Sequence, residues 1–136
     1  MDLVKSMMVA ASGMRAQTAR MKVIAENIAN ANSTTEKPGA EPYRRRMVSF
    51  ADTLDRQLGV HMVRVRKTVE DQSEFALRYD PSNPAADEKG YVKTPNVNPL
   101  IEAMDMREAQ KSYEANLNVI DSARRMLART IELLKS

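Results

Sequence analysis

Apolar residues recur at alternating steps of four and three through the first thirty residues of the chain. The stripe consists of Leu3, Met7, Ala10, Met14, Gln17, Met21, Ile24 and Ile28. Such steps average 3.5 residues, which is the period of a coiled-coil seam. Gly13 costs a helix roughly 1 kcal/mol against Ala and indicates either a close helix–helix approach or a local kink. The pattern predicts a long helix that ends near Asn30–Asn32, because Asn tolerates the left-handed conformation at a helix C-terminus.

The C-terminal part of the chain has the same alternating period, and Pro99 suits the first turn of a second long helix. Its seam consists of Met106, Ala109, Tyr113, Asn116, Ile120, Ala123, Leu127, Thr130 and Leu134. Five further apolar residues lie off this seam: Leu117, Val119, Met126, Ile131 and Leu133. The apolar surface is therefore wider than one partner helix needs, so we expect other subunits to cover the remainder.

The middle of the chain reads as strands and turns, and all six prolines lie between residues 38 and 99. Apolar residues alternate there in three runs: Val48 and Phe50; Val63, Val65 and Val69; and Phe75, Leu77 and Tyr79. Lys89-Gly90 indicates a turn before another strand at Tyr91-Val92. We therefore predict one small sheet of short antiparallel strands in this region.

These patterns predict a mainly α fold with a small β insert. Residues 1–34 form an N-terminal coiled-coil helix, residues 35–98 a β or irregular middle segment, and residues 99–136 a C-terminal coiled-coil helix. We expect the two long helices to pair as an antiparallel coiled coil and so to form one helical domain.

The composition excludes several classes of function but does not identify one. The chain has 136 residues, 4% aromatic residues, no Cys and a formal net charge of +3. Without Cys it can form neither disulfides nor thiolate metal sites, and the modest charge falls short of a nucleic-acid-binding footprint. No apolar run is long enough to span a membrane. The N-terminal residues lack the pattern of a cleaved secretory signal, so we expect any export to use another route.

No residue pattern indicates catalysis, a cofactor or a metal site. His61 lies in a predicted strand without a Cys or a carboxylate at ligand spacing, so we interpret it as an ordinary strand residue. The methionines, including Met104 and Met126, suit helix packing. Alternation along a strand places Arg45 on the face opposite Arg44 and Arg46. Solvation, or pairing between subunits with Glu70, Asp71 or Glu74, therefore explains this basic run better than nucleic-acid binding does.

Four stretches stand out in order along the chain: NIANANST at 27–34, EPYRR at 41–45, GYVKTPNVN at 90–98 and MDMREAQKSYEAN at 104–116. The first resembles the N-[LIVM]-A-N-x-x-T motif that follows the N-terminal helix of bacterial flagellar rod and hook proteins. The others resemble the Pro-Tyr-Arg, G-Y-V-x-x-P-N-V and M-x-x-A-x-R-S-Y-x-A-N stretches of the proximal rod members of that family. Lys111 stands where the family usually has Arg. The resemblance covers nearly the whole chain.

The resemblance implies a structural subunit of the flagellar basal-body rod that polymerises helically through its terminal helices into a torque-transmitting drive shaft. Its implied partners are other copies of itself, related rod proteins and the MS-ring and export-gate base proteins, with no nucleic acid, membrane insertion or small-molecule substrate. The implied location is the rod within the periplasm, reached by flagellar type III export without a cleaved signal peptide. The expected assembly residues, from the seams and the family motifs, are Leu3, Met7, Met14, Met21, Ile24, Ile28, Asn27, Asn30, Tyr43, Arg45, Tyr91, Pro95, Asn96, Met106, Tyr113, Asn116, Ile120, Leu127 and Leu134.

Two other functions fit parts of the pattern. A soluble coiled-coil adaptor or export chaperone would use the same helices to bind a client, but the β insert and the family motifs disfavour it. A small basic nucleic-acid-binding protein is disfavoured by the few aromatic residues and the scattered basic ones.

Overall fold

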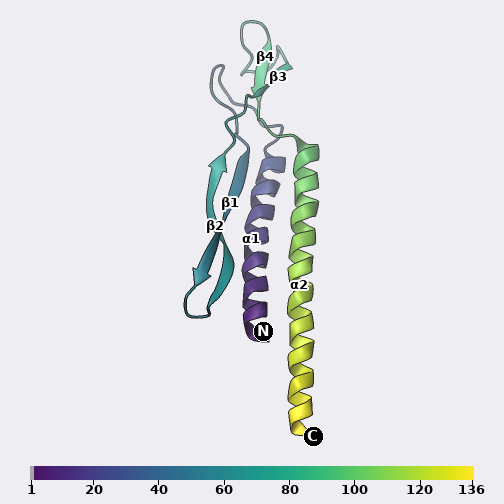
Figure 1. The fold of residues 1–136 in the computed structure, drawn as a ribbon. Coiled ribbons are helices and arrows are strands. Elements are labelled where there is room, and N and C mark those ends of the chain that lie inside the picture. The colour runs from purple at the N-terminus through teal and green to yellow at the C-terminus, as the bar shows by residue number, and fades with distance from the viewer. Residues whose placement is uncertain (1) are drawn as a thin grey trace. The chain divides into compact units, whose positions relative to one another are not determined.

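The computed structural model describes residues 2–136 as two helices with four strands between them (Figure 1). The elements are α1 (Leu3–Ala29), β1 (Arg46–Asp55), β2 (Val60–Glu70), β3 (Ala76–Tyr79), β4 (Tyr91–Thr94) and α2 (Pro99–Lys135). The predicted combination of terminal helices and a small antiparallel β insert is confirmed. The described residues fall into two compact units. The first unit contains 2–21, 48–67 and 107–136, and the second contains 22–47 and 68–106.

Side-chain caps explain where the helices begin and end. The Asp2 carboxylate accepts the amide of Val4 at 2.9 Å, and the Asn98 amide oxygen accepts the amide of Leu100 at 3.1 Å. Pro99 then occupies the first turn of α2, where its missing N–H costs nothing. At the other end of α1, the Asn30 side chain donates to the Glu26 carbonyl at 2.8 Å. α2 begins at the predicted Pro99, whereas α1 ends at Ala29, just before the predicted Asn30–Asn32 and short of the helix expected over residues 1–34. No non-glycine residue in the range 2–136 has a positive φ, so the left-handed conformation expected of an asparagine at this end is wrong.

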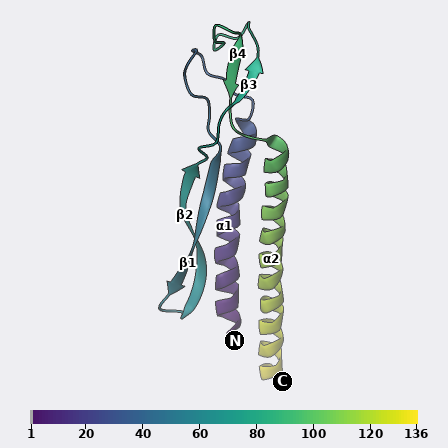
Figure 2. The same ribbon diagram turned by 45° about the horizontal axis from the view of Figure 1, so that its top comes forward.

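In the first unit, α1 and α2 lie side by side and run in opposite directions (Figures 1 and 2). The buried residues of this unit are all small: Ala10, Ser12, Ala16, Ala109 and Ala123. A Cβ atom on Gly13 would lie 2.8 Å from Nδ2 of Asn116 on α2. Gly13 thus marks a close approach of the two helices. Coiled-coil packing between them stays a prediction.

β1 and β2 form a hairpin that lies along α1 in the first unit (Figure 2). The hydroxyl of Ser12 accepts the amide of Val63 at 3.2 Å, which ties the hairpin to the helix. The strands have 10 and 11 residues, so the prediction of short strands is wrong for this pair. The prediction of one sheet is also wrong, because β1–β2 and β3–β4 are separate two-stranded sheets. An α1 helix of 27 residues offers a support long enough for an extended hairpin.

The predicted alternating run of Val63, Val65 and Val69 on β2 matches the burial of the strand only in part. Val65 and Val69 are half-buried, but Val63 is exposed and Met62 is half-buried in its place. His61 also differs from expectation, because its Nδ1 lies 2.9 Å from a carboxylate oxygen of Asp52. The hairpin brings these two residues together although nine positions separate them in the sequence.

In the second unit, β3 and β4 pair antiparallel, with Tyr79 opposite Tyr91 and Arg78 opposite Val92. The two tyrosine rings meet edge to face at 5.3 Å between centroids. Gly90 has a φ of +84°, and a Cβ there would lie 2.9 Å from the Tyr79 ring, so the predicted turn requires glycine. Val92 supplies the buried centre of this small sheet.

The methionines lie nearer the surface than the sequence suggests. Met7, Met14, Met21 and Met106 are half-buried, whereas Met104 and Met126 are exposed, so the last two do not pack in the core of the single chain. Across residues 2–136, no helix is long and apolar enough to cross a membrane.

Candidate assembly site

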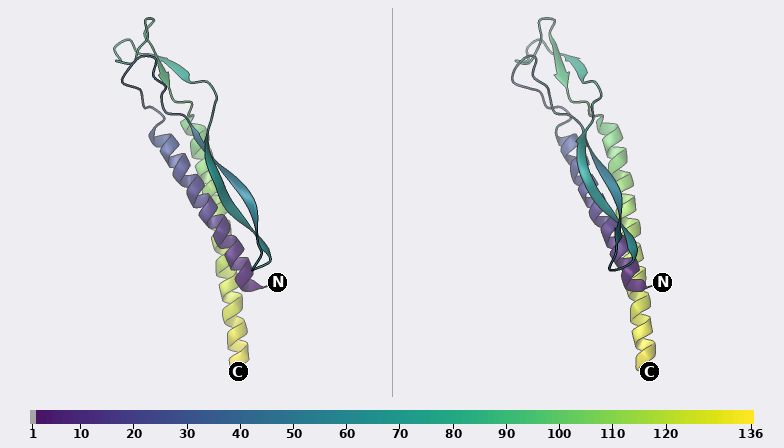
Figure 3. Two further views of the ribbon diagram at one scale, coloured as in Figure 1. Left: turned by 90° about the vertical axis from the view of Figure 1, so that its left-hand side faces the viewer. Right: turned by 60° about the vertical axis from the view of Figure 1, so that its left-hand side comes forward.

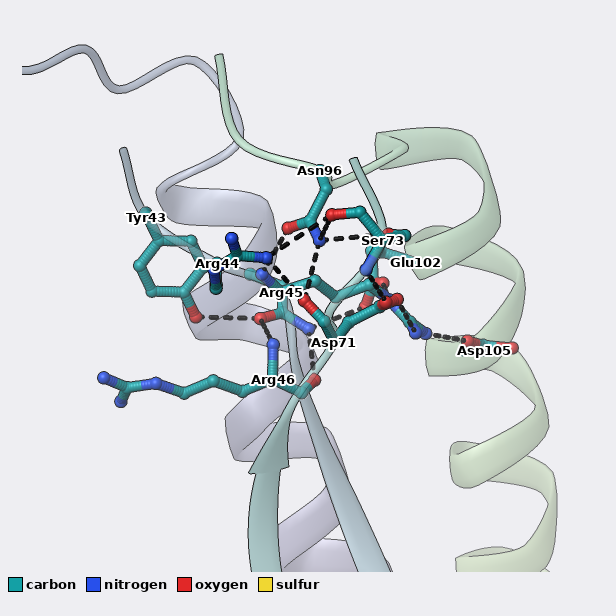
Figure 4. Close-up of polar contacts among 10 residues, drawn as sticks. Tyr43, Arg44, Arg45, Arg46, Asp71, Ser73, Asn96, Glu102 and Asp105 are labelled. Atoms are coloured by element: carbon teal, nitrogen blue, oxygen red, sulfur yellow. Dashed lines mark hydrogen bonds and ion pairs between the residues drawn. The ribbon is translucent and has the colours of Figure 1, made fainter. Parts of the chain in front are cut away.

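A buried polar cluster in the second unit surrounds Arg45 and Glu102 (Figure 4). Asn27, in the last turn of α1, is a fully buried member of this cluster. Its side-chain nitrogen donates to the Arg46 carbonyl at 2.8 Å and to the Glu102 carboxylate at 3.2 Å. Its oxygen accepts the Tyr43 hydroxyl at 2.8 Å and the Arg46 amide at 3.0 Å. A fully buried amide with all of these bonds made fixes its three neighbours in one geometry.

Arg45 and Glu102 form the charged part of the same cluster. Glu102 is fully buried in the first turn of α2, and the Arg45 Nε donates to its carboxylate. The two terminal guanidinium nitrogens lie 3.5 Å from Asp71 and 3.4 Å from Asp105. Three carboxylates thus surround one guanidinium group. The attraction among these charges offsets the free-energy cost of removing them from water only while all partners stay in place.

Asn96 joins two more segments to this cluster. Its side-chain oxygen accepts the Arg45 amide at 2.7 Å. Its nitrogen donates to the backbone carbonyls of Asp71 and Ser73 at 2.9 and 3.1 Å. We name the group the Asn27–Arg45 cluster, and its members are Asn27, Tyr43, Arg45, Asp71, Asn96, Glu102 and Asp105. It links the end of α1, the start of β1, the segment after β2 and the start of α2.

The cluster changes the acidity of its members. Burial raises the pKa of the Tyr43 hydroxyl. Burial alone would lower the pKa of Arg45, but the hydrogen bond and charge of Glu102, followed by those of Asp71, raise it overall. Hydrogen bonds from Ser73, followed by the attraction of Arg45, hold the pKa of Asp71 below its ordinary value of 3.8. All three shifts favour the protonation states that are present near neutral pH.

We predict that part of the acid sensitivity of the fold comes from Asp71. Because its pKa is lower in the folded chain, its contribution is complete above about pH 3.8 and is lost as the pH falls through the folded value. The free energy of unfolding of the wild-type chain should therefore fall more steeply below about pH 4 than that of Asp71→Asn. Urea denaturation followed by circular dichroism at several acidic pH values measures both slopes. Equal slopes would contradict this role.

The structure places several predicted assembly residues inside the chain. Asn27, Tyr43, Arg45 and Asn96 meet in the Asn27–Arg45 cluster, and Pro95 is buried next to it in sequence. The suggested Arg45–Asp71 pair forms, but within one chain rather than between subunits. Direct contact of these residues with another subunit stays a prediction.

The remaining assembly candidates are distributed between buried and accessible positions. Ile24 is buried; Leu3, Met7, Met14, Met21, Asn30, Met106, Tyr113, Asn116, Ile120 and Leu127 are half-buried; and Ile28, Tyr91 and Leu134 are exposed. The five off-seam residues of α2 are also exposed: Leu117, Val119, Met126, Ile131 and Leu133. The last turns of α2 extend beyond the N-terminal end of α1 (Figure 3), and Leu133 and Leu134 are 76% and 81% exposed there. Val119, Met126 and Leu133 recur every seven residues and form an accessible apolar surface on one face of α2, whereas Leu117 and Ile131 lie on the opposite side of the helix.

Glu102 and Asp105 are the residues that the sequence did not reveal. An acidic side chain in the first turn of a helix is common, since it complements the helix dipole, so Glu102 has an ordinary explanation. The spacing of three residues places Glu102 and Asp105 on one side of α2, which is the only sequence signal. No group of three His, Cys, Asp or Glu side chains in residues 2–136 is arranged to hold a metal ion.

Comparison with known proteins gives matches at both ends and along the whole chain. The family model described as "Flagella basal body rod protein" matches residues 7–35, and the one described as "Flagellar basal body rod FlgEFG protein C-terminal" matches residues 88–133. A protein of Agrobacterium fabrum named "Flagellar basal-body rod protein FlgC" is 53% identical over 94% of this chain and 92% of its own length. Proteins of the same name from Bacillus subtilis and Borreliella burgdorferi are each 39% identical. Those alignments cover 96% and 99% of this chain, and 97% and 99% of the relatives.

Proposed function

This chain belongs to the family of flagellar basal-body rod proteins named FlgC, and from this premise we propose how it acts as a structural subunit of the rod. The terminal helices polymerise it helically in the proximal part of the rod, where it transmits torque. Its function is mechanical and uses neither catalysis nor a cofactor. The observation that carries this proposal is the accessible apolar surface on one face of α2, which contains Val119, Met126 and Leu133.

An apolar surface of this extent favours coverage by protein. Monomeric soluble proteins rarely expose large contiguous apolar patches, and such patches are typical of interfaces. Val119, Met126 and Leu133 repeat every seven residues along α2, so a second helix can pack against them over several turns. A contact between two different surfaces of the same chain does not close on itself and builds an open helical assembly. This arrangement suits a rod.

The Asn27–Arg45 cluster supports a mechanical role. Inside the second unit, its hydrogen bonds and ion pairs connect the end of α1 to the start of α2. Buried polar networks with satisfied partners hold one geometry more strictly than apolar packing does. We propose that the cluster keeps this part of the subunit stiff under load, and that its members act on assembly by positioning the helices.

The proposed partners are other copies of the chain, related rod proteins, and the MS-ring and export-gate base proteins. The proposed location is the rod within the periplasm of a flagellated bacterium. The proposed route is flagellar type III export, which requires no cleaved signal peptide. Membership in a family of basal-body rod proteins supports the basal body as the destination.

Cell fractionation tests the proposal against the alternative of a soluble adaptor or export chaperone. A strain that lacks its own FlgC gene would express this chain with a small tag. The chain should restore swimming and should purify with detergent-extracted basal bodies, while a cytoplasmic marker protein stays in the soluble fraction. A chain found only in the cytoplasm and absent from basal bodies would indicate the adaptor instead.

A further inference from the structure

The two units of the chain carry opposite net charge. The first unit has thirteen Lys and Arg residues and seven Asp and Glu residues, which gives +6. The second unit has eight basic and eleven acidic residues, which gives −3. The overall charge of +3 hides this separation. Oppositely charged surfaces on one chain attract each other between copies and set the register of contact.

Part of the basic charge of the first unit lines a pocket. A pocket of about 440 Å³ lies between α1 and the β1–β2 hairpin, and Arg15, Arg56 and Arg64 line it. None of these three guanidinium groups forms an ion pair with another residue in the described range 2–136. The single acidic residue of the lining, Asp55, instead accepts the amides of the hairpin turn at 3.0 and 3.1 Å. The pocket therefore offers three uncommitted guanidinium groups, which bind carboxylates well.

The pocket also has an apolar wall. Leu54 and Val63 line it and are exposed, although each is large and apolar. A small inorganic anion would leave these side chains in contact with water. A polypeptide that presents carboxylates beside apolar side chains would cover both the charge and the apolar wall. The mixed lining thus favours a protein partner.

The second unit of the same chain presents a surface with that composition. Glu70 and Glu74 are exposed, and neither forms an ion pair with any other residue between 2 and 136. Close to them in sequence, Leu77 and Tyr79 on β3 are 64% and 65% exposed. Two carboxylates without an ion pair and two accessible apolar side chains within the segment 70–79 match the chemistry of the pocket.

We infer that the pocket of Arg15, Arg56 and Arg64 on one copy receives the Glu70–Glu74 surface of a second copy. The inference rests on the proposed function, because it names a contact by which the rod subunit meets its neighbour. The pocket and the acidic surface are different patches of one chain, so the contact is heterologous and can continue from copy to copy. Ion pairs at its edge make the contact sensitive to salt.

A complementary charge swap on the full-length chain tests the inference. One variant carries Arg56→Glu and Arg64→Glu, and the other carries Glu70→Arg and Glu74→Arg. Sedimentation velocity measures self-association of each variant and of an equimolar mixture at low and high salt. Each variant alone should associate at least about tenfold more weakly than the wild type, because like charges then face each other. The mixture should restore association, since every pocket meets a surface of opposite charge.

The mixture separates a lost contact from a lost fold, because two misfolded variants would not rescue each other. A third variant, Glu36→Arg with Glu88→Arg, changes two exposed acidic residues in loops of the second unit outside the contact and should associate like the wild type. The inference fails if the wild type stays monomeric at every concentration reached, if the first two variants associate normally, or if the mixture does not recover. A wild-type chain that still restores swimming and purifies with basal bodies would show that only the inference, and not the rod function, has failed.

Discussion

Arg45→Met should lower the free energy of unfolding of the isolated chain by about 3–5 kcal/mol. The substitution leaves the carboxylate of Glu102 fully buried, with the Asn27 side chain as its remaining hydrogen-bond donor. A buried charge without its counter-ion costs far more than the pair contributes when it is complete. Asp71 and Asp105 also lose the cation that separates them. Urea denaturation followed by circular dichroism at neutral pH measures the loss.

Arg46→Met is the matched control, because it removes the same group from the next residue. The Arg46 guanidinium lies 3.9 Å from Glu26, and both side chains are accessible to water, so we expect a cost below about 1 kcal/mol. The double variant Arg45→Met with Glu102→Leu should recover part of the loss, since no buried charge then remains. Similar costs for the two single variants would mean that Glu102 does not depend on Arg45.

The helices could be predicted from the sequence because their signals are local. The 3.5-residue period, the absence of proline from both ends of the chain, and the signals at Asn30 and Pro99 all depend on neighbours within a few positions. The strand pairings were harder to predict from the sequence. Period-two alternation located β1 to β3, and the Lys89-Gly90 turn located β4. Pairing depends on more distant partners, as in His61 with Asp52 nine positions away and Ala76 with Thr94 eighteen positions away.

The Asn27–Arg45 cluster could be predicted only in part. Family motifs indicated Asn27, Tyr43, Arg45 and Asn96 as important, but they did not indicate that these residues contact one another. The Asn27–Glu102 contact joins residues 75 positions apart, and no periodicity encodes such a pair. The buried residues of the first unit show a similar limit. The seam pattern treats Met and Ala alike, whereas the close approach at Gly13 buries the alanines and leaves the methionines half-covered.

We expect stability of the subunit and assembly of the rod to depend on different residues. The buried alanines and the Asn27–Arg45 cluster hold the fold of each unit. The exposed residues of α2 contribute little to that fold, because water still reaches them in the isolated chain. A substitution can therefore remove assembly without unfolding the subunit. α2 offers a pair of neighbouring positions that separates the two effects.

We predict that Met126→Asp and Ala123→Asp both abolish swimming, for different reasons. Met126 is 51% exposed, so a carboxylate there stays hydrated in the isolated chain and should cost less than about 1 kcal/mol. It becomes unfavourable only when another subunit covers α2, because burying an unpaired charge costs several kcal/mol. Ala123 is 2% exposed, so the same carboxylate is buried in the subunit itself and should destabilise the first unit. Soft-agar swimming assays and circular dichroism of the purified chains measure the two effects.

The test compares the folding of Met126→Asp and Ala123→Asp, since both variants should lose swimming. Both place one aspartate within a single turn of the same helix, so helix propensity and net charge change almost equally. Only Ala123→Asp should lose helical signal and melt early as a purified chain, whereas Met126→Asp should resemble the wild type in solution. Gln110→Asp, at an exposed polar position of α2, should change neither property. Normal swimming by Met126→Asp would mean that this face of α2 remains in water in the assembled rod. In that case the helices would pack against other subunits through a different surface.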